Sequence, residues 1–327
     1  MVFSKDKWNS EEGFRKFISA SKALSFDTML VPLSQAWQMF IVPLTGEALA
    51  ARLAGLYALG MADRSKEEQR LLEMAQNALA NLALYCSFEE LNVRLTDQGH
   101  QRQETDNFKG LYKYQKDDMR QSYKVKGFNA LDSMLEYVDC RVDVFPEWKE
   151  SRAYTRRQKM VVRSASEIND VVFINNSFIV YLRMVPIINR IVDTVLPSKL
   201  GAKLFKAFMD GLGGNDVIGD TTTEELRFRV RKYVVMMAAA ELVRETGSLT
   251  DRGLYFESVT AGKDGNDVVA PSSMTERTHA LSVYDRSVND YGHALDSFIE
   301  MFIPDMFAGR ASDVFKRDND GKKTVWL

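Results

Sequence analysis

Residues Leu95-Thr96-Asp97-Gln98-Gly99 recur, with one difference, 154 residues later as Leu249-Thr250-Asp251-Arg252-Gly253. The segment Ala130-Leu131-Asp132-Ser133 returns as Ala294-Leu295-Asp296-Ser297, at the larger distance of 164 residues. Self-similarity over a long period defines an architecture more firmly than any local pattern does. The sequence therefore predicts an all-α chain built from two tandem copies of one helical module of roughly 150 residues.

Two pairs of prolines repeat at the same 154-residue distance. Pro32 and Pro43 of the first copy correspond to Pro186 and Pro197 of the second. Proline donates no backbone hydrogen bond and ends or bends a helix from within. We expect these four prolines to be helix breaks at corresponding places, with a kink at Pro186. We also expect the repeated residues of the two copies to superpose.

Composition is typical of a soluble globular protein. The 327 residues are 45% hydrophobic and 27% charged, and they suffice for two domains with separate cores. The 43 Lys and Arg against 45 Asp and Glu give a net charge of −2, which argues against a broad basic surface for nucleic acid. Cys86 and Cys140 are too few for a disulfide framework, so free thiols in a reducing compartment are expected.

The sequence predicts no cleaved leader and no membrane partner. Residues 1–7 have no apolar run behind them, as a signal peptide would require. No stretch approaches the ~20 apolar residues that cross a bilayer. We therefore expect the protein to be made in the cytoplasm and to remain outside membranes.

The first module is predicted over 1–140. Ser10 and Ser25 are expected to begin its first two helices, and Leu30 and Leu33 to lie on the buried stripe of the second. Later helices are predicted over 47–59, 65–91, 108–123 and 129–137. The second module is predicted over 164–308, with helices from 166, over 176–195, 199–209, 224–245, 275–288 and 291–302. A long loop over 254–274 distinguishes it from the first module.

Two further segments complete the predicted organisation. Residues 141–163 form a basic linker that contains Lys149, Arg152, Arg156, Arg157, Lys159 and Arg163. Its charge indicates either a solvated linker, which the balanced overall charge favours, or a contact with an acidic partner or a phosphate backbone. Residues 309–327 are predicted as an extended tail. Trp326 and Leu327 are expected to contact a partner, for instance as an added strand, although chain ends commonly fray.

The reactive groups of an enzyme do not gather in this sequence. His100, His279 and His293 lack a second ligand at metal-binding spacing. The glycine-rich run 211–214 lacks the Lys-Ser/Thr of a phosphate-binding loop, and 318–321 lacks the rest of a calcium loop. The sequence thus predicts no catalytic, cofactor-binding or metal-binding residues, and a protein that is not an enzyme.

Asp97 and Asp251 recur as the acidic residues of the two repeated turn segments. Paired carboxylates can serve acid–base catalysis. An Asp side chain can equally bind backbone N–H groups in a turn, with Gly99 and Gly253 taking a positive φ two residues later. The second interpretation is favoured, so these four residues are predicted to form structural turns.

The repeated residues resemble those of head–tail connector (head-completion or adaptor) proteins of tailed bacteriophages. More closely, the chain resembles uncharacterised connector-like proteins of Bacteroidetes phages and prophages. The likeness lies in Ile41-Val42-Pro43-Leu44-Thr45-Gly46, in the turn at 95–99 and in the last helix, 130–137. It covers 10–140 and, more loosely, 165–305. The second copy departs at 192–197, where the glycine comes later, at Gly201.

The resemblance implies a virion protein that forms a ring in the phage neck, at the head–tail junction. Such a ring, a homo-oligomer and by the resemblance a dodecamer, would contact the portal protein and other neck or tail ring proteins. It would provide an assembly platform and a channel through which genomic DNA passes without specific binding. A mildly acidic chain suits that channel, because a basic lumen would retain phosphates. One alternative is a non-viral tandem helical protein–protein interaction scaffold. Another is an all-α enzyme whose site assembles from residues far apart in the sequence.

Overall fold

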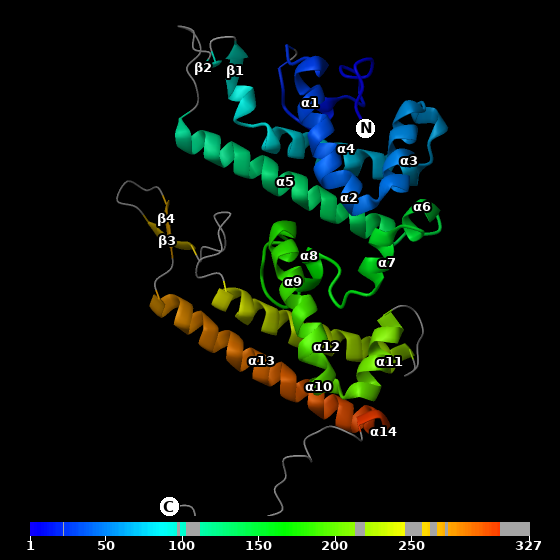
Figure 1. Cartoon of the computed structure of the whole chain (residues 1–327), viewed down its shortest axis with the longest axis vertical. Coiled ribbons are helices and arrows are strands. Elements are labelled where there is room, and N and C mark those ends of the chain that lie inside the picture. The colour runs from blue at the N-terminus through cyan, green and yellow to red at the C-terminus, as the bar shows by residue number, and fades with distance from the viewer. Residues whose placement is uncertain are drawn as a thin grey trace, which may run out of the picture. The chain divides into compact units, whose positions relative to one another are not determined.

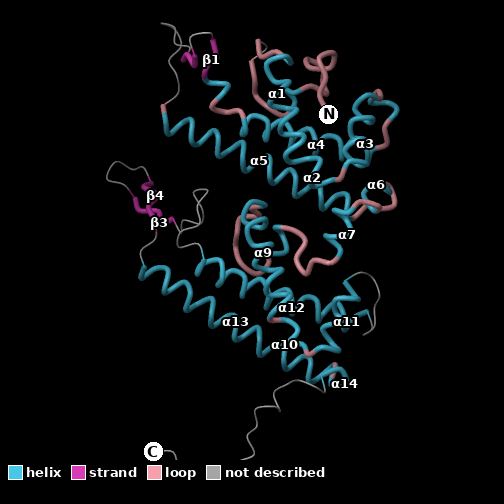
Figure 2. Tube along the Cα trace, viewed as in Figure 1, coloured by secondary structure: helices cyan, strands magenta, loops and turns pink. Residues whose placement is uncertain are grey.

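The structure is a computed structural model that describes residues 1–21, 23–96, 99–102, 112–212, 220–245, 257–261, 267–271 and 274–307. The chain divides into two compact units. Unit 1 comprises 1–158 with 164–166 and 174–181, and unit 2 comprises 159–163, 167–173 and the residues from 182 onward. Helices dominate the described part of both units (Figures 1 and 2), which confirms the all-α class.

The first part of the chain alternates short and long helices. Its elements are η1 (Phe14–Lys16), α1 (Phe26–Ala36), the π-helical turn η2 (Trp37–Ile41), α2 (Val42–Thr45), α3 (Glu47–Ala58), η3 (Met61–Asp63), α4 (Lys66–Cys86), η4 (Glu90–Asn92), β1 (Val93–Thr96), β2 (Gly99–Arg102), α5 (Lys113–Asp139), α6 (Pro146–Lys149) and α7 (Arg152–Gln158). The strands β1 and β2 form an antiparallel hairpin.

The second part follows the same order. Its elements are α8 (Ala165–Asn169), α9 (Phe178–Thr194), α10 (Leu196–Leu200), α11 (Ala202–Leu212), α12 (Asp220–Glu245), β3 (Glu257–Ala261), β4 (Asp267–Pro271), α13 (Met274–Phe302) and α14 (Pro304–Phe307). A long helix, a hairpin and a second long helix occur in both parts, as Figure 2 shows by colour. This shared order of elements is what two copies of one module would have. The superposition of the two copies stays a prediction.

The core of unit 1 is built around α4, which lies along α5 and also packs against α1 (Figure 1). A capping box begins α4, because the Ser65 side chain accepts from the Glu68 N–H while Glu68 accepts from the Ser65 N–H. Leu72, Ala75 and Leu79, which lie along one face of α4, are fully buried. A Cβ on Gly127 would lie 2.6 Å from Leu82 Cγ, so glycine is needed for the close approach of α5 to α4.

In unit 2, α12 and α13 form the corresponding long pair (Figure 1). One face of α12 is buried. Its buried residues include Leu226, Val230, Val234, Ala238 and Leu242. Their spacing of four is the periodicity of one helix face.

Matching serine caps begin α1 and α9. The Ser25 side chain accepts from the Thr28 N–H at 3.2 Å, and the Ser177 side chain accepts from the Val180 N–H at 3.4 Å. A phenylalanine follows each serine as the first helical residue. The expected cap at Ser25 is confirmed, whereas Ser10 begins no α-helix, and only the short turn η1 follows it. Leu30 was expected to be buried but is exposed, since Met29 takes the inward place.

A proline followed by a glycine ends the segment after each of these helices. Pro43 lies in the first turn of α2, and Gly46 ends that helix with φ 81° and ψ 159°. Pro197 lies in the first turn of α10, and Gly201 ends it with φ 77° and ψ 152°. The later glycine of the second copy therefore has the same backbone conformation as Gly46, after a helix one residue longer.

The other two prolines lie inside helices. Pro32 lies within α1 and Pro186 within α9, and both helices continue beyond them. The described backbone has its π-helical turn, Trp37–Ile41, five residues after Pro32. Pro32 therefore does not end its helix. The kink expected at Pro186 stays a prediction.

Three sequence predictions about segment boundaries were wrong. The helices predicted over 108–123 and 129–137 are one helix, α5, and those over 275–288 and 291–302 are α13. Polar residues on the outer face of a long helix weaken its apolar stripe and suggest a break that is absent. The loop predicted over 254–274 contains the hairpin of β3 and β4, whose β-branched residues favour strands.

Residues 141–158 belong to unit 1 and do not form the predicted linker. Trp148 of α6 is fully buried, and its Nε1 donates to Asp139 at 2.9 Å. Arg157 of α7 is also buried and forms an ion pair of 2.8 Å with the same carboxylate. One of the basic residues of this segment is therefore a structural ion-pair partner. Lys149, Arg152 and Arg156 are exposed.

Candidate functional site

The predicted turn residues are only partly described. In the first hairpin, Thr96 pairs with Gly99 and Leu95 with His100, so a two-residue connection joins the strands. Asp97 lies in that connection, outside the described residues. Asp251 and Gly253 also lie outside them. The structural turns predicted at these residues therefore stay a prediction.

The predicted partner-contact residues, Trp326 and Leu327, lie outside the described residues. The same is true of the whole predicted tail, 309–327. Their docking on a partner therefore stays a prediction.

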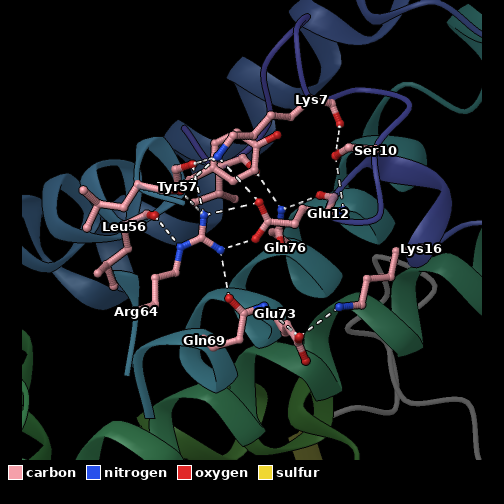
Figure 3. A network of polar contacts seen from close by, with 12 residues as sticks. Lys7, Ser10, Glu12, Lys16, Leu56, Tyr57, Arg64, Gln69, Glu73 and Gln76 are labelled. Carbon is pink, nitrogen blue, oxygen red and sulfur yellow. Dashed lines mark hydrogen bonds and ion pairs between the residues drawn. The ribbon is translucent and has the colours of Figure 1, made fainter. Parts of the chain in front are cut away.

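The densest set of polar contacts in unit 1 surrounds the Arg64 guanidinium, and we call it the Arg64 network (Figure 3). Arg64 pairs with Glu12, 52 residues earlier, through Nη1 and Nη2. Nη1 also donates to Gln69 Oε1 at 2.8 Å. The Arg64 side chain is fully buried and that of Glu12 nearly so. A buried charge is tolerated only when it is paired and hydrogen-bonded, as it is here.

The Arg64 network also satisfies the end of α3. Nε of Arg64 donates to the Leu56 carbonyl at 2.7 Å, and Nη2 donates to the Leu59 carbonyl at 2.5 Å. Lys7 Nζ donates to the Tyr57 carbonyl at 2.6 Å. The last carbonyls of a helix have no partners within the helix, and its C-terminus attracts cations. Two cations from separate segments thus cap one helix end.

Two further contacts fix the N-terminal segment to α4. Gln76 Nε2 donates to the carbonyls of Val2 at 3.1 Å and Glu12 at 3.0 Å. Lys16 Nζ lies 2.8 Å from Glu73 Oε1 (Figure 3). Burial opposes ionisation of Glu73, but the hydrogen bonds from Lys16 and Gln69 dominate and lower its pKa. The network therefore holds 1–16 against α3 and α4.

Unit 2 contains a comparable arrangement at the end of α11. Arg163 donates to the Leu212 carbonyl at 3.3 Å, and Arg227 donates to the Gly211 carbonyl. Arg231 of α12 donates to the Val161 carbonyl at 3.4 Å and pairs with Glu167 at 2.9 Å. Val161, Arg163 and Glu167 of unit 2 are thus joined to α11 and α12 by cations, much as 1–16 is held in unit 1.

A second polar set lies along α5, and we call Asn129, Asp132 and Glu136 the α5 row. Their spacing of three and four places them on one helix face. Asp132 accepts from the Ala165 N–H at 3.1 Å, and Glu136 accepts from the Ser166 hydroxyl at 2.6 Å. Asn129 accepts from the Phe178 N–H at 3.4 Å. The α5 row therefore binds 164–166 and the start of α9, all within unit 1.

The chemistry of both sets is that of attachment. Among the described residues, no group of three or more His, Cys, Asp and Glu is arranged to hold a metal ion. Burial raises the pKa of the Cys86 thiol, which disfavours its thiolate. Burial likewise raises the pKa of Tyr57, whose backbone carbonyl belongs to the Arg64 network. What these residues can do is fix one segment of chain to another.

Sequence reasoning missed both polar sets. A buried arginine looks like any surface arginine in a sequence, and Glu12 and Arg64 lie far apart along the chain. The α5 row contained a signal that could have been followed, because Asp132 is one of the repeated residues. The repeated ALDS segment marks a helix face that binds other backbone.

No helix in the described part of the chain is both long and apolar enough to span a membrane. Residues 41–158 match the model of a Family of unknown function (DUF6712). The match ends at the residue where the continuous part of unit 1 ends, and it includes α6 and α7. No curated protein and no solved structure matches the chain.

Proposed function

We propose that the chain is a structural protein of the neck of a tailed bacteriophage, where it forms a ring between portal and tail. The observation that carries the proposal is the repeated order of helices, together with the motifs that resemble those of head–tail connector proteins. Its partners would be further copies of itself, the portal protein and neighbouring ring proteins. Genomic DNA would pass through the ring, and the protein would act without catalysis or cofactors.

Physical features of the units support such a role. The long pairs α4–α5 and α12–α13, with short connected helices packed on them, form units suited to transmit force without deforming. Copies related by a rotation that divides a circle close into a ring through a head-to-tail interface. A net charge of −2 suits a channel in which DNA must slide.

Electron microscopy of the purified full-length chain, alone and mixed with the portal protein encoded near it, tests the proposal. We expect closed rings with a central channel, or rings that appear when the portal is present. Mass spectrometry of purified virions should then find the chain at the head–tail junction. A protein that forms no ring under either condition and is absent from particles would instead fit the interaction scaffold.

A further inference from the structure

The α5 row has a counterpart in the second copy. At the 164-residue shift of the repeated ALDS segment, Asn129, Asp132 and Glu136 correspond to His293, Asp296 and Glu300 of α13. We call these three residues the α13 row. The Asp and the Glu are the same in both rows, while His293 stands where the α5 row has Asn129. Asp296 forms an ion pair of 2.8 Å with Lys199 of the same unit.

The two helix faces differ in what covers them. In α5, the face is occupied by 164–166 and the start of α9, and Ala130 and Val138 are buried. Along α13, the described part of the chain leaves several of the corresponding residues exposed. Ala294 and Glu300 are exposed. Phe302, which corresponds to Val138, is 60% exposed, and its neighbour Met301 is 72% exposed.

The residues that occupy the α5 face have counterparts near the N-terminus. Ser166 begins the sequence Ser-Glu, as Ser10 does, and the cap Ser177 with Phe178 corresponds to Ser25 with Phe26. Ser25 is exposed and Phe26 half-buried. Leu30 and Val31, one turn further along α1, are exposed apolar residues. One chain thus has on α13 an exposed face that resembles the covered face of α5. It also has, near its N-terminus, a segment that resembles the one covering α5.

We propose that the α13 face of one chain binds the N-terminal segment of a second copy, at Ser10 and the start of α1. The template is the contact that 164–166 and 174–181 make on α5. In such a pair the Ser10 hydroxyl, which donates to the Lys7 carbonyl at 2.8 Å in the single chain, would turn and donate to Glu300, as Ser166 does to Glu136. Met301 and Phe302 would meet the exposed apolar residues of α1, which removes both sets from water.

This contact joins different surfaces of the two chains, so it propagates from chain to chain instead of ending at a dimer. The inference deepens the proposed function and rests on it, because it names the interface from which the ring would be built. Covering an apolar surface with a second copy also accounts for a Phe and a Met exposed side by side, since large apolar patches mark interaction sites.

The first test compares two arginine variants of the full chain by sedimentation velocity over a range of concentrations. Ala294→Arg places a charge in the centre of the proposed contact, and we expect it to weaken association by at least about 30-fold. Val283→Arg is the matched control, because Val283 and its counterpart Met119 are both exposed, so that position lies outside the contact. It should associate like the unmodified chain.

The second test identifies the occupant. A photoreactive p-benzoylphenylalanine replaces Ser297, which is exposed beside Ala294, and the chain is mixed with an isotopically heavy copy. Cross-links to residues 10–31 of the other isotopic form are expected. Cross-links to 308–327 would make the tail the occupant and overturn the proposal. So would a chain that stays monomeric at every concentration and on the portal.

The inference and the proposed function fail differently. If rings form and Ala294→Arg assembles them as well as Val283→Arg does, the α13 contact is wrong and the ring remains. If association depends on Ala294 but yields only open chains that never join the portal, the contact is right and the phage-neck role is wrong.

Discussion

Gln76 of α4 and Arg231 of α12, 155 residues apart, bind equivalent carbonyls. The first donates to Val2 O at 3.1 Å and the second to Val161 O at 3.4 Å. Each carbonyl belongs to a Met-Val dipeptide that precedes the first helix of its copy. Each contact thus holds the chain before a short helix against a long helix of the same unit. An amide makes the contact in unit 1, and a guanidinium makes it in unit 2.

Arg64→Met should destabilise unit 1 strongly. The substitution removes the closest partner of the buried Glu12 carboxylate, which keeps only Lys7 at 3.5 Å. It also leaves the Leu56 carbonyl without the Arg64 donor, while the Leu59 carbonyl keeps Lys7 at 3.0 Å. Breaking a buried pair in this way costs about 3–5 kcal/mol. Urea denaturation followed by circular dichroism measures the loss. Arg70→Met, at an exposed position of α4, is the control and should change stability by less than about 0.5 kcal/mol. If the two variants lost the same free energy of unfolding, the Arg64 network would not be important for stability.

Gly201→Ala should cost about 1–3 kcal/mol, because φ 77° with ψ 152° is a region that is essentially restricted to glycine. No atom lies within 4 Å of the added Cβ, so the loss would report backbone strain alone. Gly55→Ala, inside α3 and also with open space around it, is the control and should stabilise by about 0.5–1 kcal/mol. Thermal unfolding of both variants decides the matter, and a stabilised Gly201→Ala would contradict the assigned backbone.

Stability should fall in acid partly through Glu68. The Ser65 N–H and the Arg52 guanidinium donate to this carboxylate and lower its pKa below the ordinary 4.5. A lowered folded-state pKa gives stability that is present above the unfolded pKa and is lost as pH falls through the folded one. Denaturation from neutral pH down to about pH 3 should show a shallower decline in Glu68→Gln than in the unmodified chain. Parallel curves would mean that Glu68 makes no difference.

Asp97→Ala and Asp251→Ala should act on stability or assembly. Each is expected to cost about 0.5–2 kcal/mol, as the loss of a turn or cap hydrogen bond does. Melting temperatures and ring formation provide the measurements, with Asp97→Asn as the conservative variant that keeps an acceptor oxygen. An unchanged melting curve together with loss of a chemical activity would restore the catalytic interpretation.

Removal of 313–327 should impair assembly while leaving the helical units folded. The tail ends in Trp326 and Leu327, and burial of such a pair on a partner contributes about 3–5 kcal/mol before the cost of ordering the tail. Circular dichroism checks the fold, and incorporation into particles checks the assembly. A truncated chain that joins particles as well as the full chain would show that this end is dispensable.

Much of the fold could be read from the sequence where a local rule applied. Ser25 and Ser65 are caps, and the inward residues of α12 follow a spacing of four. Continuity of α5 and α13 could not be read in this way. Close contact along α4 and α12 keeps them helical through stretches with little apolar periodicity.

The Arg64 network and the packing of 141–163 could not be predicted from the sequence. Burial of Arg64 depends on residues 52 positions away, and the capping of α3 depends on where Lys7 arrives in space. The segment 141–163 looked like a linker because its basic residues cluster between the two predicted modules. Its position is set by a few large side chains, of which Trp148 is completely enclosed.

The α5 row binds residues of its own chain, and this sets how strong its contacts need to be. Partners held on one chain meet at a high effective concentration, so a few hydrogen bonds keep them together. Between separate chains, the same few contacts would be weak and would form only where copies are crowded. The α13 face would then stay unbound in dilute protein. It would bind a second copy only after the portal protein had brought several chains together, so the ring would form after that step and not before it.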